Sequence, residues 1–384
     1  LTMPTKTFFP HLDALRFFAF FAVFVNHVFN SLGYYNPSPT WKFILRTFFS
    51  TGPLGVSFFF VLSGFLITYL LLEEKELHGR IDLKKFYMRR ILRIWPLYFL
   101  IVGLALLVFP HFKEHVPDGF PIKFGTENLN PWLYVGFAGN MDYLLNGINN
   151  VIIGVLWSVS IEEQFYLFWP LIISFLPKKR LIPAFLFVIL GSVLFRFFFS
   201  NGGNIKCINY HSFSCISDLA IGAVFAYLAT FKKFTDHIHR LPAYIIGVVY
   251  FLGFALLPFR DYIWKFGVHY VHVASVLPVL VALFFAFIIM EQCYAKHSFY
   301  KAGNLTRISK LGTYTYGMYC YHMTVFFILL LIFSQLGIRV SSISSLQLTF
   351  TGLLSLLLTI GLSKLSYLYF ESKFLELKRK FAST

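Results

Sequence analysis

The chain has 384 residues, of which 57% are hydrophobic and 13% charged, with a formal net charge of +16. Because soluble domains carry roughly 25% charged residues, this composition excludes an ordinary soluble domain. The basic residues gather in alternate linkers, which indicates a membrane topology and not nucleic-acid binding. The apolar residues form runs of about 20, the length of a helix that crosses a bilayer. We therefore predict an all-α, polytopic membrane protein.

Ten apolar runs along the chain predict ten membrane-spanning helices. Their expected ranges are 11–33, 52–72, 94–110, 154–176, 181–200, 213–231, 241–258, 272–290, 313–333 and 346–368. An even number of spans places both termini on one side. That side receives 24 of the 33 Lys and Arg residues, which leaves 9 for the other side. Because basic residues stay cytoplasmic, both termini are predicted to be cytoplasmic, in a multi-pass protein of the cell inner membrane.

The first span contains two ionisable residues, Arg16 near its cytoplasmic start and His27 eleven residues later. Eleven residues of α-helix return to within about 20° of the same direction over about 16 Å, so both side chains line one face. Asp13 lies three residues before Arg16 and is predicted to pair with it. Ionisable residues are costly inside a bilayer and are therefore candidates for function. The alternative for His27 is a plain hydrogen bond to a neighbouring helix.

Basic residues mark the start of the third span, where Arg89, Arg90 and Arg93 stand in the motif at 86–96. Arg90 and Arg93 are three residues apart and share a helix face. Guanidinium groups suit bidentate phosphate binding. The alternative is that these residues satisfy the positive-inside rule and contact lipid phosphates. In the second span, the small residues of the block at 55–65 indicate close helix packing.

The longest outer linker, about 111–153, carries Trp132 and Asp142 among other aromatic and polar residues. A linker of this length is functional or disordered in most proteins, and its apolar content predicts that it packs over the outer face. Cys207 and Cys215 share a later outer linker, and the sequence leaves open whether they are bridged. The twelve histidines are scattered without ligand spacing, so no metal site is predicted.

The fourth and ninth spans hold further polar candidates. The fourth begins with the block at 157–166, where Glu162 and Glu163 are adjacent and point about 100° apart, so at most one can face a cavity squarely. A carboxylate here can accept a proton, orient an imidazole or bind sugar hydroxyls; the alternative is an acid favoured by the helix dipole. The ninth span holds His322 among four tyrosines, for which a structural hydrogen bond and a catalytic part are both open.

In this order, these blocks resemble the membrane acyltransferase-3 family, whose members acylate sugars of cell-surface polysaccharides and other small acceptors. The matching stretches are Asp13 to Arg16 with His27, Gly55 to Phe65, Phe86 to Pro96, Trp157 to Tyr166, and Gly312 to His322. The resemblance implies ten spans and transfer of an acyl group, acetyl by default, from cytoplasmic acyl-CoA to a carbohydrate hydroxyl. It also implies that Arg16 and His27 are the essential arginine and histidine.

The resemblance and the residues together assign expected roles. His27 is the expected general base, with Arg16, Glu163 and Glu162 as further catalytic candidates. Acyl-CoA phosphates are expected at the basic motif of the third span, on Arg89, Arg90 and Arg93. Acceptor-binding candidates are Trp132, Asp142, Trp157, Ser160, Tyr166 and His322.

We expect residues 1–384 to form one transmembrane domain without the hydrolase-like domain that some family members carry. A separate partner protein that completes transfer is therefore an open alternative. The rival function is a transporter, such as a flippase of a lipid-linked sugar, which would also place ionisable residues in ten spans. Transporters often show inverted repeats with broken helices, and no such repeat is visible in this sequence.

Overall fold

The computed structural model describes residues 9–30, 52–116, 129–147, 150–201, 204–257, 271–338 and 344–381. Within these ranges the chain is almost wholly helical, and nine helices are long and apolar enough to cross a membrane. A tenth candidate is a pair of helices bent by 89°. The all-α fold with about ten spans is thus confirmed. Residues 31–33 of the first predicted span and residues 117–128 of the predicted outer linker lie outside the described residues.

Ten helices correspond to the ten predicted spans. They are α1 (Pro10–Asn30), α3 (Gly52–His78), α4 (Leu83–Gly103), α8 (Trp157–Phe175), α9 (Lys178–Asn201), α11 (Ser212–Ala229), α13 (Ala243–Leu256), α15 (Val271–Tyr294), α17 (Thr315–Gln335) and α18 (Ser345–Ser366). Shorter helices join or extend them: α5 (Pro131–Val135), α6 (Gly139–Asn146), α7 (Val151–Gly154), α10 (Ile205–Tyr210), α12 (Lys232–His239), α16 (Thr306–Gly312) and α19 (Ser372–Arg379).

The third span begins earlier than predicted, because α4 starts at Leu83 and not near residue 94. Asp82 caps this helix by accepting a hydrogen bond from the backbone N–H of Lys85 at 3.0 Å. The Lys, Arg, Met and Leu residues that follow are good helix formers, so the charged segment continues the apolar helix. The arginine motif therefore lies inside α4, on a rigid element, and not in the loop before it.

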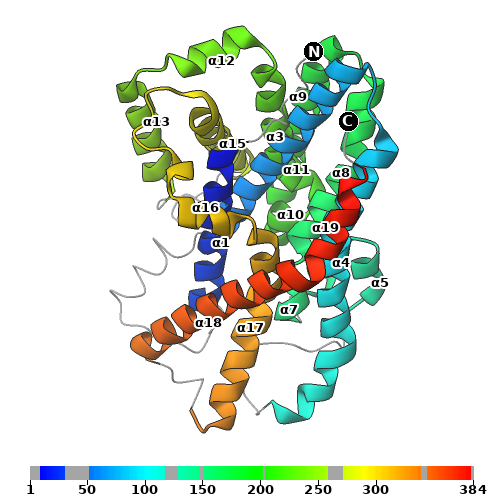
Figure 1. Cartoon of the computed structure of the whole chain (residues 1–384), viewed down its shortest axis with the longest axis vertical. Helices are drawn as coiled ribbons and strands as arrows, with labels where there is room; N and C mark the ends of the chain where they lie inside the picture. Colours follow the sequence, from blue (N-terminus) through cyan, green and yellow to red (C-terminus); the bar gives the residue numbers. More distant parts are fainter. Residues whose placement is uncertain are drawn as a thin grey trace.

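The seventh predicted span is also different, because α13 has only 14 residues. A helix of that length spans about 21 Å, less than the hydrocarbon core of about 30 Å. The preceding α12 is turned by 89° from α13 and lies across the upper end of the bundle in Figure 1. Lys232 and Lys233 begin α12, and a helix with this charge is suited to lie along a membrane surface rather than across it.

Glycines allow α3 to pack closely against α1 and α11. A Cβ on Gly55 would lie 2.4 Å from the carbonyl oxygen of Ala19, and one on Gly64 would lie 1.9 Å from that of Leu219. From the other side, a Cβ on Gly222 would lie 2.0 Å from the carbonyl oxygen of Val61. The predicted packing role of the small-residue block in the second span is confirmed.

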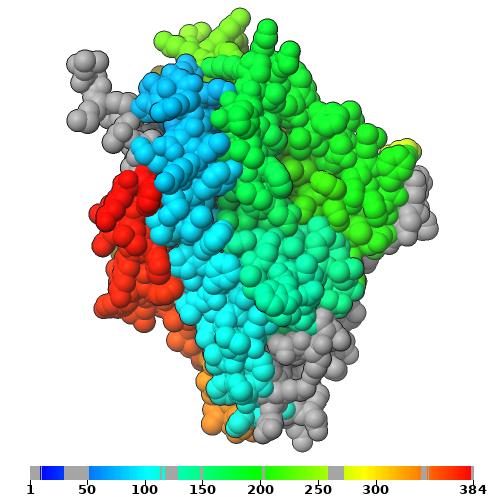
Figure 2. Space-filling view, turned by 90° about the vertical axis from the view of Figure 1, so that its right-hand side faces the viewer, coloured from blue at the N-terminus to red at the C-terminus, as the bar shows by residue number. Residues whose placement is uncertain are grey.

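The C-terminal helices wrap the bundle obliquely. α18 crosses the front of the molecule at a steep angle to α4 in Figure 1, and α19 then turns up along it. α19 packs against α4, as the red segment beside the blue-to-cyan segment in Figure 2 shows. This packing covers the side of α4 that carries Arg89, whose Nη1 donates to the carbonyl oxygen of Phe381 at 2.9 Å.

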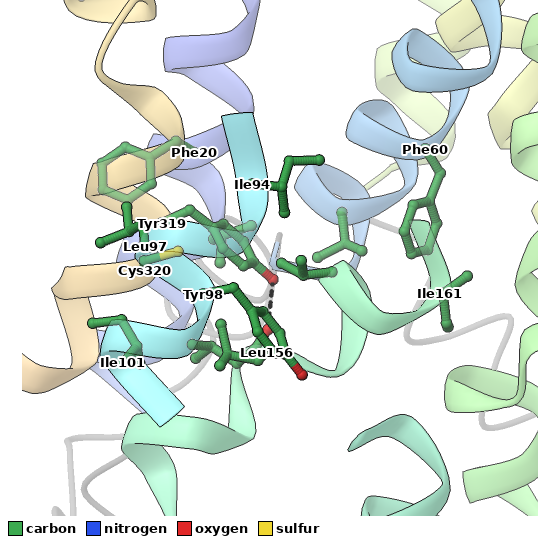
Figure 3. Close-up of a cluster of buried hydrophobic side chains, with 14 of the residues drawn as sticks. Phe20, Phe60, Ile94, Leu97, Tyr98, Ile101, Leu156, Ile161, Tyr319 and Cys320 are labelled. Carbon is green, nitrogen blue, oxygen red and sulfur yellow. Dashed lines mark hydrogen bonds between the residues drawn. The ribbon is translucent and has the colours of Figure 1, made fainter. Parts of the chain in front are cut away.

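A core of large side chains joins α1, α4, α8 and α17 in the middle of the bundle. Figure 3 shows Phe20, Leu97, Tyr319 and Cys320 gathered there, with Tyr98 and Leu156 beside them. Phe20, Tyr98 and Cys320 are fully buried. This core fixes the spacing of the four helices that carry the polar candidates described next.

Candidate active site

A cavity of about 280 Å³ opens between α1, α3, α4, α8, α16 and the start of α17. Its wall is mostly apolar, from residues such as Phe59, Leu66 and Ile67. Charged side chains from three helices also line it: Asp13, Arg16, Arg90, Arg93 and Glu162. Segments that are far apart in the sequence therefore converge on one cavity. It brings together Arg16, Arg90, Arg93 and Glu162, whereas the predicted base His27 is not among the residues that line it.

The arginines of the cavity differ in their partners. Arg16 forms an ion pair with Asp13, as predicted from the i,i+3 spacing. The guanidinium carbon of Arg90 lies 5.5 Å from the ring centres of both Phe86 and Tyr166, and its buried Nε has no hydrogen-bond partner among the described residues. A guanidinium held against two aromatic rings at the wall of this cavity is a cation that can bind an anion.

The third arginine of the motif lies elsewhere. Arg89 does not line the cavity, and its Nη2 lies 3.1 Å from the Glu74 carboxylate while its Nη1 binds the C-terminal segment. Arg89 therefore ties α4 to α3 and to the chain beyond α19. Of the three arginines expected to bind acyl-CoA, the structure brings Arg90 and Arg93 to the cavity and leaves Arg89 at a structural contact.

The two adjacent glutamates of α8 diverge as helical geometry requires. Glu162 lines the cavity, where its Oε2 accepts a hydrogen bond from the Tyr166 hydroxyl at 3.2 Å. That hydroxyl is also hydrogen-bonded to Ser63. Glu163 points away and accepts from the Trp95 indole N–H at 2.9 Å, while its buried Oε1 has no partner within the described part of the chain.

His27 is paired with a histidine and not with a glutamate. Its Nδ1 lies 2.8 Å from Nε2 of His322 on α17. The Nδ1 of His322 lies 2.7 Å from the carbonyl oxygen of Tyr319, a residue whose side chain lines the cavity. His322 is fully buried and both of its ring nitrogens are engaged, so neither is free to bind an acceptor.

The two acceptor-binding candidates of the outer linker, Trp132 and Asp142, differ in their exposure. Trp132 is 78% exposed and is free to contact an acceptor. Asp142 is 2% exposed and accepts from the backbone N–H of Asn130 at 3.0 Å, the Tyr134 hydroxyl at 3.2 Å and the Asn146 amide at 2.9 Å. Burial raises the pKa of the Tyr134 hydroxyl, and the negative charge of the Asp142 carboxylate raises it further. The hydroxyl therefore keeps its proton and remains a hydrogen-bond donor. Asp142 thus organises the outer linker.

Two candidates at the start of α8 face the interior. Trp157 packs edge-on against Tyr210 and Phe60, with ring centres 4.8 and 6.2 Å apart. The Ser160 hydroxyl accepts from the backbone N–H of Gly139 at 3.2 Å and is fully buried. Ser160 therefore holds α6 on α8, and the outer linker packs onto the bundle through this contact.

Cys207 and Cys215 are both free thiols, and the Cys215 thiol donates to the carbonyl oxygen of Asn209 at 3.3 Å. In the described ranges no three His, Cys, Asp or Glu side chains come together in a way that suits a metal ion.

Sequence reasoning did not single out Arg196, which is 1% exposed between α9, α11 and α15. Its Nε donates to the Ser275 carbonyl at 2.9 Å, and its Nη1 donates to the Ser192 hydroxyl at 2.8 Å and to that of Ser217 at 2.9 Å. Arg196 therefore links α9, α11 and α15 through hydrogen bonds. The sequence signal was an arginine inside the Phe-rich run at 195–199, because an ionisable residue in an apolar span needs partners. The cavity residue Ser158 was also missed, since a hydroxyl in an apolar span carries no pattern of its own.

Comparisons with known proteins identify the family of the chain. The family described as "Acyltransferase domain" (Acyl_transf_3) matches residues 9–364. O-acetyltransferase OatA of Staphylococcus aureus strain NCTC 8325 is 25% identical over 390 residues, which cover 96% of this chain and 58% of OatA. "Putative O-acetyltransferase SACOL0978" of Staphylococcus aureus strain COL is 26% identical over 325 residues, which cover 82% of this chain and 50% of that protein.

The chain spans about half the length of these curated relatives. No solved structure matches it. The family match covers far more than half of the chain and includes every helix that lines the cavity. The protein therefore belongs to the acyltransferase-3 family, as its motifs predicted.

Proposed function

We propose that the protein transfers an acyl group, acetyl in the simplest case, from cytoplasmic acyl-CoA to a hydroxyl of a cell-surface carbohydrate. One observation carries this proposal: the guanidinium groups of Arg16, Arg90 and Arg93 converge in a cavity that is otherwise mostly apolar. Family membership and the O-acetyltransferase names of the relatives support the reaction class.

The donor follows from the chemistry of the cavity wall. CoA carries phosphates at one end and a thioester at the tip of a thin arm. Guanidinium groups bind phosphate oxygens in pairs, and the apolar wall accepts the arm. Because Asp13 already neutralises Arg16 and Arg89 lies outside the cavity, we assign the phosphates to Arg90 and Arg93.

The acceptor is assigned to the opposite end of the bundle. We propose that both termini face the cytoplasm, which places the start of α1 and the cavity's arginines on that side of a cytoplasmic membrane. The outer linker, with Trp132 exposed, then faces outward, where an aromatic surface can stack on a sugar. We propose that the whole chain acts as one transmembrane domain and that donor and acceptor meet at His27.

The proposed chemistry uses His27 as a general base. Its imidazole takes the proton from the acceptor hydroxyl, the hydroxyl oxygen bonds to the thioester carbonyl carbon, and the carbon–sulfur bond breaks. CoA leaves as a thiolate, which receives the proton from the imidazolium. A positioned base of this kind contributes about 10²- to 10⁴-fold to the rate.

Donor binding is testable with arginine-to-alanine variants of α4. We expect calorimetry on the protein in nanodiscs to show micromolar binding of acetyl-CoA. Arg90→Ala/Arg93→Ala should weaken this binding at least tenfold, because each charge-assisted hydrogen bond contributes about 1.5–3 kcal/mol. Arg89→Ala is the matched control: the same side chain is removed from the same helix, and binding should persist.

Two outcomes would contradict this assignment. If Arg89→Ala lost binding as fully as the double variant, general surface charge and not the cavity would hold the donor. If the wild type bound neither acetyl-CoA nor longer acyl-CoAs, the donor class would be wrong, and transport of a lipid-linked sugar would become the better hypothesis for the buried charges.

A further inference from the structure

Two imidazoles from helices 295 residues apart in the chain meet end to end in the bundle. The His27 Nδ1 and the His322 Nε2 are 2.8 Å apart. The ring planes are parallel to within 5°, and the ring centres are 5.1 Å apart. That separation is the nitrogen–nitrogen distance plus one ring radius on each side, so the rings share a plane instead of stacking. This is the geometry of an in-plane N–H···N hydrogen bond.

The direction of that hydrogen bond follows from the next contact. A carbonyl oxygen can only accept, so the His322 Nδ1, 2.7 Å from the Tyr319 carbonyl, must carry a hydrogen. A neutral imidazole has one N–H, which leaves the His322 Nε2 as an acceptor. The His27 Nδ1 therefore carries the hydrogen between the rings, and the His27 Nε2 holds an unshared electron pair.

The surroundings hold His322 in this arrangement. The Phe20 ring meets its imidazole edge-on at 5.8 Å, and the Phe24 ring lies at 6.3 Å. His322 is fully buried, whereas His27 is only half-buried. His322 is thus fixed by packing, whereas His27 remains partly exposed.

We propose that His322 is a positioning residue that fixes the tautomer and the ring orientation of His27, so that the His27 Nε2 is the atom that accepts the acceptor's proton. This inference rests on the proposed function, in which His27 is the general base. It assigns to His322 the part that the sequence suggested for Glu162 or Glu163, and it replaces acceptor binding as the role of His322. When His27 becomes an imidazolium during transfer, the His322 Nε2 lone pair continues to accept its Nδ1–H.

The pairing can be measured without turnover, by nitrogen NMR of the protein labelled with ¹⁵N-histidine in nanodiscs. The resonances of the pair are assigned by their loss in His27→Gln and His322→Gln. We expect wild-type His27 to show a protonated Nδ1 and an unprotonated Nε2. His322→Leu should return His27 to the tautomer mixture of a free imidazole. A protonated Nε2 on His27 in the wild type would overturn the proposal.

Activity gives the second readout. In His322→Leu, kcat should fall about 10²- to 10⁴-fold, because an imidazole in the wrong tautomer cannot act as the base. The KM for acetyl-CoA should stay the same, since His322 does not line the cavity. His322→Gln keeps an acceptor near the place of Nε2 and should recover at least tenfold in kcat over the leucine variant. Met323→Leu, at the next buried position of α17, is the matched control and should be fully active.

These outcomes separate the inference from the proposed function. If the wild type transfers acetyl groups and His27→Gln does not, while His322→Leu keeps full kcat, only the positioning role is wrong. If His322→Leu and His322→Gln lose activity equally with unchanged melting temperatures, the hydrogen bond is not what matters, and the positioning role is again wrong. If the wild type shows the expected tautomer but transfers no acyl group from any acyl-CoA, the proposed function fails and the pairing stands.

Discussion

Glu162 and Glu163 are neighbours in the sequence but lie in different surroundings. One lines the cavity beside Tyr166, and the other accepts a hydrogen bond from Trp95 between α8 and α4. Helical geometry predicted that only one could face a cavity. Which one does so depends on where α4 packs against α8, and no local pattern in either segment carries that information.

The pair gives a prediction at the residue scale. Glu162→Gln should lower kcat about tenfold or more, because the cavity loses a negative charge, while the amide oxygen can still accept from Tyr166. Glu163→Gln should leave kcat within about threefold, since an amide oxygen can still accept from Trp95; its effect should be a lower melting temperature, because hydrogen bonds to charged groups contribute about 1.5–3 kcal/mol. Initial rates and thermal unfolding of both variants check this. Equal rates in the two variants would show that the cavity carboxylate plays no special part.

The pairing of His27 with His322 likewise depends on helix packing and not on a local sequence pattern. Because α1 is one continuous helix, the spacing of Arg16 and His27 puts both on one side of it. The partner of His27, however, comes from α17, near the other end of the chain. The sequence shows His322 only as one polar residue among tyrosines. A pairing over this separation requires the packing of α17 against α1, which hydropathy and spacing do not encode.

At the scale of elements, the positions of the spans were predictable because a bilayer demands long apolar helices. The ends of the helices were less predictable. α4 begins well before the apolar run, because Asp82 caps a charged segment that is itself a good helix former. α13 is short because α12 turns away from it by 89°. Hydropathy predicts the apolar part of a helix, but it predicts neither a polar extension of the helix nor a bend.

The close contact between α3 and α11 gives a prediction at this scale. Gly64→Ala should lower the thermal unfolding temperature in detergent by several degrees, because the new Cβ would lie 1.9 Å from the backbone oxygen of Leu219, and overpacking costs about 1–3 kcal/mol. Gly191→Ala in α9 is the matched control, since nothing lies within 4 Å of its Cβ position. It should be neutral or slightly stabilising, as alanine is the better helix former. A harmless Gly64→Ala would contradict the close approach of the two helices.

At the scale of the whole molecule, helices from both ends of the chain form two features: the cavity lined by arginines and the pair of histidines. Arg16 and His27 come from α1, Arg90 and Arg93 from α4, Glu162 from α8, and Tyr319 and His322 from α17. The motifs predicted the family and most of these participants. The outer linker was different: Asp142 and Ser160 looked like acceptor ligands but hold the linker in place, because polar residues that satisfy backbone groups look the same in sequence as polar residues that bind a substrate.

Acetyl transfer by His27 variants tests the central claim most directly. Membranes that contain the wild-type protein, supplied with radiolabelled acetyl-CoA, should accumulate acetyl esters on envelope carbohydrate that mild base releases. Membranes with His27→Gln at the same level, shown by calorimetry on the purified variant still to bind acetyl-CoA, should form at least about 10²-fold less ester. Full ester formation by His27→Gln would contradict the account, because a base other than His27 would then have to perform the transfer.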